Sequence, residues 1–266
     1  MRGAVIGALL LAALGAEARP RSVGSPQGGE LQDGFHVPLT GAWHSFYGPV
    51  RSRGTNYATL ELAALLIRAA RVVDDAVPGP PLVIADVSAE GGGDLGRHMS
   101  HNSGRDVDVL FYVQDLEGKP VRPRGFVAFD GDGRCAARGC DKVRFDDQRN
   151  WWFVRTLLAS EDVPVQYVFV SDPLKERLLA YAAARGESPR ILRRARKVLQ
   201  EPRGSSPHAD HYHVRIYCSA ADRQGGCVDR QPVWPWVKGE ASDGGDGHQD
   251  SDGDQGTDET VKGATQ

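Results

Sequence analysis

Long hydrophobic runs are missing from this chain after its first residues, and histidine is missing from its middle. Beyond the apolar segment that ends at Leu14, no stretch approaches the roughly twenty apolar residues that a membrane-spanning helix requires. We therefore expect no membrane span. None of the 8 histidines lies between His101 and His208, so a site built on histidines must combine residues from the two sides of this gap.

Cysteine is also scarce, with 4 residues in 266, and the first of them is Cys135. No cysteine near the N-terminus is therefore available for lipidation. The four form two sequence-local pairs, Cys135 with Cys140 and Cys218 with Cys227, which predict two disulfides in an oxidising compartment. A zinc site built from all four is the alternative, but intervals of four and eight intervening residues fit it poorly.

The first 18 residues have the pattern of a secretory signal peptide. Arg2 precedes the apolar run, and Ala16-Glu17-Ala18 is a small-x-small cleavage signal. We expect residues 1–18 to be removed on export. A cytosolic protein with an unusually apolar first helix is the alternative.

Composition changes sharply at residue 238. Residues 238–266 are rich in Asp, Gly, Ser and Gln, which predicts a disordered acidic tail. Their eight acidic residues and two lysines give −6, and Arg2 cancels Glu17, so the total of −3 leaves residues 19–237 at about +3. We expect residues 19–237 to form one domain, whose mildly basic charge suits an anionic polymer such as a bacterial wall.

Local patterns predict both helices and strands in this domain. Helices are expected over residues 56–77, 147–160, 172–185 (capped by Asp172) and 189–200, and strands over 82–87, from 106, 163–170 and 212–218. Residues 19–55, with His36 and His44 as loop histidines, are expected to be an irregular arm, and residues 114–146 a surface excursion. The fold class is therefore α+β, a single domain with a central, mainly antiparallel sheet flanked by helices.

The segment from His98 to Asp108 places two histidines and two aspartates in eleven positions. Asp106 and Asp108 are two apart at the start of an apolar strand, so they share one face of it. His101 lies in the glycine-containing turn just before and can fold back beside Asp108. An imidazole and a carboxylate that converge in this way suit a divalent metal of the zinc type.

A later segment, His208-Ala-Asp-His211-Tyr-His213, supplies the missing ligand. His211 and His213 are two apart and point the same way from a second strand. Three protein ligands, His101, Asp108 and His213, would leave one position of a zinc ion open, as catalytic sites do. His211 would then act as general base or stabilise the developing oxyanion, and His208 would orient His211 or donate to the intermediate.

Together the two segments resemble the penicillin-insensitive murein endopeptidases, within the lysostaphin, D-Ala-D-Ala metallopeptidase and hedgehog superfamily. The superfamily pattern is a His, six residues, an Asp and a distant His-x-His, here His101, Asp108 and His211-Tyr-His213. The details Ser-His-x-x-Gly-x-Asp-Val-Asp and His-x-x-His-x-His-Val-Arg are narrower and point to the murein endopeptidase branch. The resemblance covers roughly residues 22 to 230.

The resemblance implies a periplasmic metallopeptidase with a hedgehog and D-Ala-D-Ala metallopeptidase-like fold. It implies the same Zn²⁺ ligands, with His211 and His208 lining the cleft. The substrate would be peptidoglycan, cleaved between D-alanine and a diamino acid of the neighbouring stem peptide. Without an activated serine, the enzyme would be insensitive to β-lactams. Some members bind a second zinc at a dimer interface through an Asp and a His from mid-chain, and the histidine gap argues against that site here; a homodimer is an expectation only.

Several alternatives stay open at this point. The chain can be a D,D-carboxypeptidase of the same superfamily, a non-catalytic zinc module that binds wall or protein, or a calcium-dependent adhesion module with Asp-rich loops. Nucleic acid is not an expected partner of an exported protein, and the basic residues of 189–200 are expected to form a solvated face.

Asp106 is either a partner of a ligand histidine or a turn cap. His98 is a solvent-facing loop residue, an auxiliary ligand or a group that orients a ligand, and Arg105 and Arg215 are candidates to contact a substrate carboxylate.

Overall fold

The computed structural model describes residues 19–136 and 140–237. The expected signal peptide and the acidic tail lie outside these residues. Within them, none of the helices combines the length and apolar character needed to cross a membrane.

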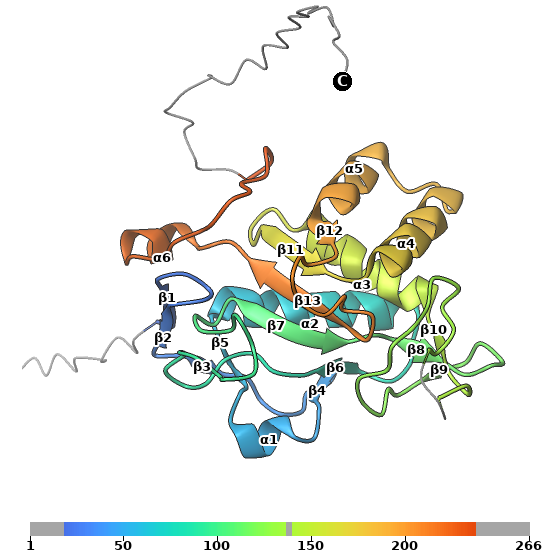
Figure 1. The fold of residues 1–266 in the computed structure, drawn as a ribbon, viewed down its shortest axis with the longest axis horizontal. Helices are drawn as coiled ribbons and strands as arrows, with labels where there is room; N and C mark the ends of the chain where they lie inside the picture. The colour runs from blue at the N-terminus through green and yellow to red at the C-terminus, as the bar shows by residue number, and fades with distance from the viewer. Residues whose placement is uncertain (1–18, 137–139, 238–266) are drawn as a thin grey trace, which may run out of the picture.

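The described residues build one α+β domain around a six-stranded sheet with the order β12-β11-β13-β7-β6-β4 (Figure 1). The strands are β4 His44–Phe46, β6 Leu82–Ile84, β7 Asp106–Leu110, β11 Val165–Phe169, β12 Leu199–Gln200 and β13 His211–Ile216. The four middle strands are antiparallel, whereas β12 and β4 pair in parallel with their neighbours. The predicted class is confirmed, but the sheet is mixed, and the antiparallel expectation holds only for its centre.

Strands β7 and β13 carry two unlike faces. Their register places His213 opposite Asp108 and Arg215 opposite Asp106. Because side chains alternate along a strand, the residues next to these polar ones in sequence point to the other face. Those residues are buried in the hydrophobic core: Val107, Val109, Tyr212 and Val214.

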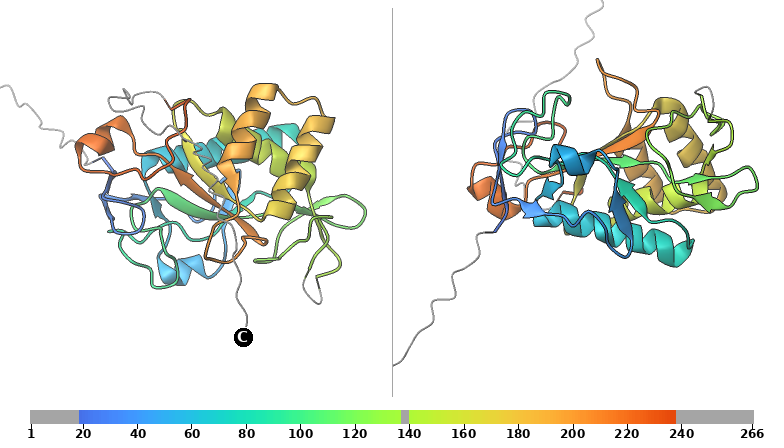
Figure 2. Two further views of the ribbon diagram at one scale, coloured as in Figure 1. Left: turned by 45° about the horizontal axis from the view of Figure 1, so that its top comes forward. Right: turned by 90° about the horizontal axis from the view of Figure 1, so that it is seen from below.

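Helices α2 (Leu60–Ala76) and α3 (Asp147–Ala159) cover this apolar face. The ring of Phe153 on α3 stacks on Tyr212, with 5.8 Å between centroids. The predicted apolar face of α2 is buried: Leu62, Leu65, Leu66, Ala69 and Val73. The predicted start at residue 56 is wrong, because Thr59 is the N-cap and its side chain accepts the N–H of Leu62. Figure 2 shows α2 along one side of the sheet and loops gathered at the opposite side.

Three of the remaining helices flank the sheet or its end, namely α4 Asp172–Ala184, α5 Pro189–Val198 and α6 Ala220–Gln224. Ser188 caps α5 by accepting the N–H of Ile191, and Pro189 is its first residue. The predicted cap of α4 is wrong by one residue: Ser171 occupies the N-cap, and Asp172 lies in the first turn. An acidic residue there still complements the positive end of the helix dipole.

The N-terminal segment is more regular than expected. It forms β1 Arg21–Val23, β2 Glu30–Gln32, β3 Phe35–His36 and the short helix α1 Val50–Arg53, and β3 pairs with β5 Tyr57–Ala58. Its strand β4 is an edge of the central sheet, so His44 is a buried strand residue whose Nε2 lies 2.8 Å from the carbonyl oxygen of Pro38. His36 is exposed on β3. Strands of two or three residues are too short to show a period.

Residues 113–136 and 140–145 belong to a lobe beside the sheet, built on a three-stranded sheet. Its strands are β8 Val113–Gln114, β9 Pro120–Val121 and β10 Arg144–Phe145, at the right of Figure 1. The Cys135–Cys140 disulfide lies in this lobe, and Cys218–Cys227 joins the segment after β13 to the end of α6. Both predicted disulfides are present, so the alternative of a four-cysteine zinc site is wrong.

Candidate metal centre

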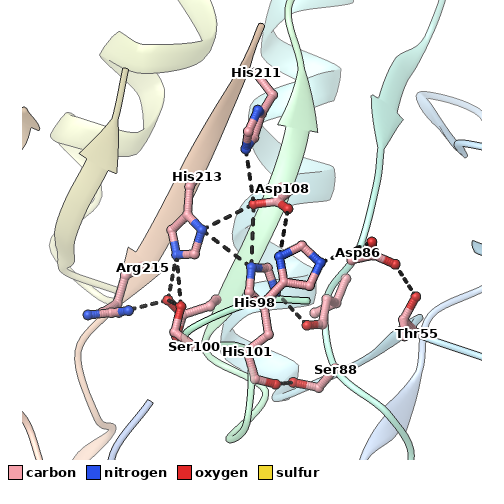
Figure 3. Close-up of polar contacts among 12 residues, drawn as sticks. Thr55, Asp86, Ser88, His98, Ser100, His101, Asp108, His211, His213 and Arg215 are labelled. Atoms are coloured by element: carbon pink, nitrogen blue, oxygen red, sulfur yellow. Dashed lines mark hydrogen bonds and ion pairs between the residues drawn. The ribbon is translucent and has the colours of Figure 1, made fainter. Parts of the chain in front are cut away.

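Two imidazoles and one carboxylate converge on the polar face of β7 and β13 (Figure 3). His101 Nε2 lies 3.3 Å from His213 Nδ1, and these atoms lie 3.4 Å and 3.1 Å from the same oxygen of Asp108, Oδ1. His101, Asp108 and His213 are all buried. The structure therefore brings together the three residues expected to bind metal.

The outer nitrogen of each imidazole is occupied by an acceptor. His101 Nδ1 lies 2.6 Å from the carbonyl oxygen of Val87, so Nδ1 carries the proton and Nε2 presents a lone pair. His213 Nε2 lies 2.6 Å from Asp106 Oδ1, so this nitrogen donates and Nδ1 presents its lone pair. Two lone pairs and a carboxylate oxygen thus face one point, an arrangement that a cation completes.

Asp108 supplies an independent observation on whether these residues fit a cation. Within the described residues its Oδ1 is buried and has no hydrogen-bond partner, although three imidazole nitrogens lie 3.1 to 3.5 Å away. These contacts are close but not aligned as hydrogen bonds, and a buried oxygen without a partner is rare. Burial alone would raise the pKa of Asp108, yet the imidazoles, His101 foremost, lower it well below its usual value. The residues therefore fit a divalent metal.

His98 is part of this cluster, and the expectation of a solvent-facing loop residue is wrong. Its Nδ1 lies 3.6 Å from Asp108 Oδ2, and its ring centroid lies 4.4 Å from that of His101. One candidate ligand atom each of His98, His101 and Asp108 falls within 4.8 Å of the others. This geometry is compatible with both other expectations, an auxiliary ligand or a group that orients a ligand.

Asp86 orients His98 and was not found from the sequence. Its Oδ2 lies 3.2 Å from His98 Nε2, and Arg53 and Thr55 donate to the same carboxylate. Burial would raise the pKa of Asp86, but hydrogen bonds from His98, Thr55 and Arg53 lower it to about 2. The only local signal was an acidic residue within an apolar strand pattern.

Asp106 contacts His213, one of the histidines expected to bind metal, which agrees with one of its two predicted roles. Besides His213, its Oδ1 accepts from Arg215 Nε at 2.7 Å and from the Ser100 hydroxyl at 3.3 Å. Burial would raise the pKa of Asp106, but the charge of Arg215 and the hydrogen bond of His213 lower it below its usual value. An ionised Asp106 fixes the tautomer of His213.

His211 and His208 lie next to the cluster, and their surroundings shift their pKa values in opposite directions. His211 Nε2 is 3.5 Å from Asp108 Oδ1 and its Nδ1 is 2.6 Å from Asp210 Oδ1. Burial would lower the pKa of His211, but Asp108 and Asp210 raise it to about 9. The His208 ring is 4.6 Å from that of His211, and burial together with the charge of His211 lowers the pKa of His208 to about 4.

The backbone around the cluster is constrained. His101 has a φ of 82° and His208 a φ of 52°, a region that non-glycine residues seldom occupy. The Ser88 hydroxyl donates to the carbonyl oxygen of His101 and accepts the N–H of Gly104, which holds the turn. Such conformations cluster at functional sites, where the surrounding structure maintains them.

These side chains open into a cleft of about 430 Å³. Arg97, Arg203 and Arg215 line it, as do Phe126 and Phe169. Arg105 does not, so its expected contact with substrate is wrong. Its guanidinium is buried and bonded to Ser22, to Asp229 and to backbone carbonyls, which ties the start of β7 to the segment after α6.

A buried cluster of imidazoles and a carboxylate, with a further histidine beside it at a cleft, has the donor set of a metallopeptidase. The sequence model of the penicillin-insensitive murein endopeptidase family matches residues 22–252, and the chain belongs to that family. The predicted family is therefore confirmed.

Two relatives that carry the name penicillin-insensitive murein endopeptidase illustrate the distance within the family. The relative from Klebsiella pneumoniae subsp. pneumoniae is 26% identical over 158 residues, which are 58% of this chain and 51% of the relative. The relative from Escherichia coli O1:K1 is 28% identical over 179 residues, or 66% and 58%. The chain thus spans little more than half the length of these relatives.

Proposed function

We propose that this protein is a zinc-dependent endopeptidase that hydrolyses the D-alanyl–diamino acid cross-links of peptidoglycan in the periplasm. The observation that carries the proposal is that three donor atoms face the same point. They are the lone-pair nitrogens of His101 and His213 and the Oδ1 of Asp108, which has no hydrogen-bond partner among the described residues. Membership of the family supports murein as the substrate. The proposal includes the hedgehog and D-Ala-D-Ala metallopeptidase-like fold that the family resemblance implies.

His101, Asp108 and His213 would hold the zinc and leave one position open for water, with His98 beside Asp108 as an orienting group. Nitrogen and carboxylate ligands suit Zn²⁺. When bound, the ion supplies Lewis-acid chemistry that polarises the scissile carbonyl and favours ionisation of water. Asp86, Asp106 and the Val87 carbonyl keep the three imidazoles in the tautomers that binding requires.

His211 is the proposed general base. Asp210 holds its Nδ1, so Nε2 faces the cleft and can take a proton from the attacking water and pass it to the leaving amine. A cation on Asp108 would weaken one of the two carboxylate interactions that raise the pKa of His211, which brings that pKa nearer the range of a base. His208, with its lowered pKa, stays neutral and orients the His211 ring.

None of these roles uses a serine nucleophile. β-Lactams act by acylating an activated serine, so we expect them not to inhibit the protein. The Ser100 hydroxyl is already engaged with Asp106.

The test is incubation of the purified protein with cross-linked muropeptide dimers, with and without a zinc chelator, beside a His211→Ala variant. Conversion of dimers to monomers only with zinc and His211 present is the expected result. Release of a terminal D-alanine from intact dimers, seen by product mass, would instead indicate a D,D-carboxypeptidase. Intact dimers with zinc bound would contradict the enzyme and favour a binding module.

A further inference from the structure

A second cavity, larger than the cleft, does not contain the cluster of His101, Asp108 and His213. It measures about 1030 Å³, against about 430 Å³ for the cleft. It lies where the lobe of β8, β9 and β10 meets the segment after β4. We call it the basic pocket and define it by three of the five valines and by the three cations in its wall: Val83, Val113, Val127, Arg122, Arg124 and Lys142.

The basic pocket adjoins the cleft through one side chain. Phe126 lines the cleft, and its ring meets that of His211 edge-on at 5.1 Å. On its other side the same ring meets Tyr47, a wall residue of the basic pocket, at 5.5 Å. A polymer bound at His211 therefore needs to pass only Phe126 to enter the basic pocket.

The charges of the basic pocket are not neutralised. None of its three cations forms an ion pair with a described residue, and all three are exposed. The one carboxylate in the wall is Asp115, which leaves a net charge of +2 from three cations and one anion. Asp115 Oδ1 already accepts the N–H groups of Glu117 and Lys119 in its own turn. Such a pocket suits an anion that also has an apolar part.

We propose that the basic pocket binds a carboxylate-bearing stem peptide of the same peptidoglycan whose cross-link occupies the cleft. This inference rests on the proposed function. Stem peptides carry free carboxylates for the cations and alanine methyl groups for the valines. Peptidoglycan continues on both sides of each cross-link, so a neighbouring stem can occupy the basic pocket during cleavage. The protein then binds the polymer more tightly than an isolated dimer can be bound.

The first test measures binding to purified sacculi by co-sedimentation, in a His211→Ala background that keeps the wall intact. The test variant is Arg122→Glu/Arg124→Glu, and the matched control is Arg193→Glu/Lys197→Glu, an equal charge change at exposed residues of α5. We expect binding to weaken about tenfold in the test variant and less than about twofold in the control. Equal weakening in both variants, or none in either, would overturn the proposal. Circular dichroism of each variant checks that it is folded.

The second test separates this inference from the proposed function. With His211 intact, the same charge reversal should slow digestion of sacculi several-fold and leave digestion of soluble dimers unchanged. An equal loss on both substrates would refute the basic pocket but not the endopeptidase. If the unaltered protein cleaves neither substrate while its binding to sacculi depends on Arg122 and Arg124, the endopeptidase fails and the basic pocket stands.

Discussion

The side chains on both faces of β7 and β13 are largely buried, but burial affects the stability of the fold differently on the two faces. Toward α2 and α3, Val107, Val109 and Tyr212 leave water for an apolar core, which stabilises the fold. On the opposite face, Asp106 and Asp108 are buried with one oxygen each that has no hydrogen-bond partner among the described residues, which costs stability. Changes on the core face should therefore lower stability, and changes on the polar face should lower metal binding and activity.

The largest effect is expected for Asp108→Asn. Loss of the anionic ligand should remove the metal and lower hydrolysis about a thousandfold, equivalent to about 4 kcal/mol. The free energy of unfolding of the metal-free protein should fall less than it does for a core truncation. The imidazoles that lower the pKa of Asp108 lose their anionic partner, but a buried oxygen without a hydrogen-bond partner is removed as well. Metal content by mass spectrometry, dimer hydrolysis and urea unfolding check this, with exposed Asp132→Asn as control. A large loss of stability would break the comparison.

Leu65→Ala tests the core face. Leu65 is fully buried on α2, and its truncation should lower the free energy of unfolding by about 3 kcal/mol. Activity per folded molecule should be unchanged. Leu60 on the same helix is 40% exposed, so Leu60→Ala should cost no more than about 0.5 kcal/mol. Similar costs at both positions in urea denaturation would argue against the described packing.

Asp106→Asn tests a residue of the polar face that contacts His213 and is not itself a proposed metal ligand. The neutral amide can no longer pair with Arg215 or fix the tautomer of His213 as firmly. We expect zinc affinity to fall about 10- to 100-fold in competition with a chromophoric chelator. Asp162→Asn removes an exposed partner of Arg68 instead and should leave zinc affinity unaltered. Unchanged affinity in the Asp106 variant would show that Asp106 does not support His213.

Asp86 is a buried carboxylate that, unlike Asp108, is well paired, and we expect it to stabilise the fold. Its pKa is about 2 in the folded protein against 3.8 as the ordinary value. Because the folded pKa is the lower one, the contribution is complete above about pH 4 and is lost as pH falls toward 2. We expect a loss of about 2 kcal/mol over this window by chemical denaturation, in wild type but not in Asp86→Asn. Parallel pH curves for the two proteins would refute the assignment.

Thr59→Ala should have the smallest effect, because Thr59 belongs to neither face. Its side chain caps α2 through the N–H of Leu62, so the free energy of unfolding should fall by about 1 kcal/mol. Thr59→Ser keeps the capping oxygen and should recover most of this. Thermal unfolding of the two variants provides the measurement, and equal losses would show that the cap is not the cause.

Elements with strong local signals could be predicted from the sequence. The Ser188 cap with Pro189 located α5, and the alternation around His211 and His213 located β13. Strand β4 could not be located, because it is three residues long and its place in the sheet depends on pairing with β6. The start of α2 was missed because residues 57–58 pair with β3 rather than continue the helix.

The residues of the site also fall into two groups, those that local sequence patterns predict and those that depend on contacts between distant segments. Spacing, together with the family resemblance, predicted that His101, Asp108, His211 and His213 share one site, and the structure brings them together. The contacts of Asp86 with Arg53, Thr55 and His98 join three separate segments, and no local pattern reports such contacts. Arg105 was misjudged for the same reason, since its partners Ser22 and Asp229 are distant in sequence.

The contact between His101 and Val87 has a consequence for mutational studies. The group that fixes the His101 tautomer is a main-chain carbonyl, and every amino acid at position 87 supplies one. Replacing Asp106 or Asp86 removes the orienting group itself, whereas an apolar replacement that the core accepts at the buried Val87 leaves the carbonyl in place. One of the three imidazoles is therefore oriented by the path of the chain and not by a side chain.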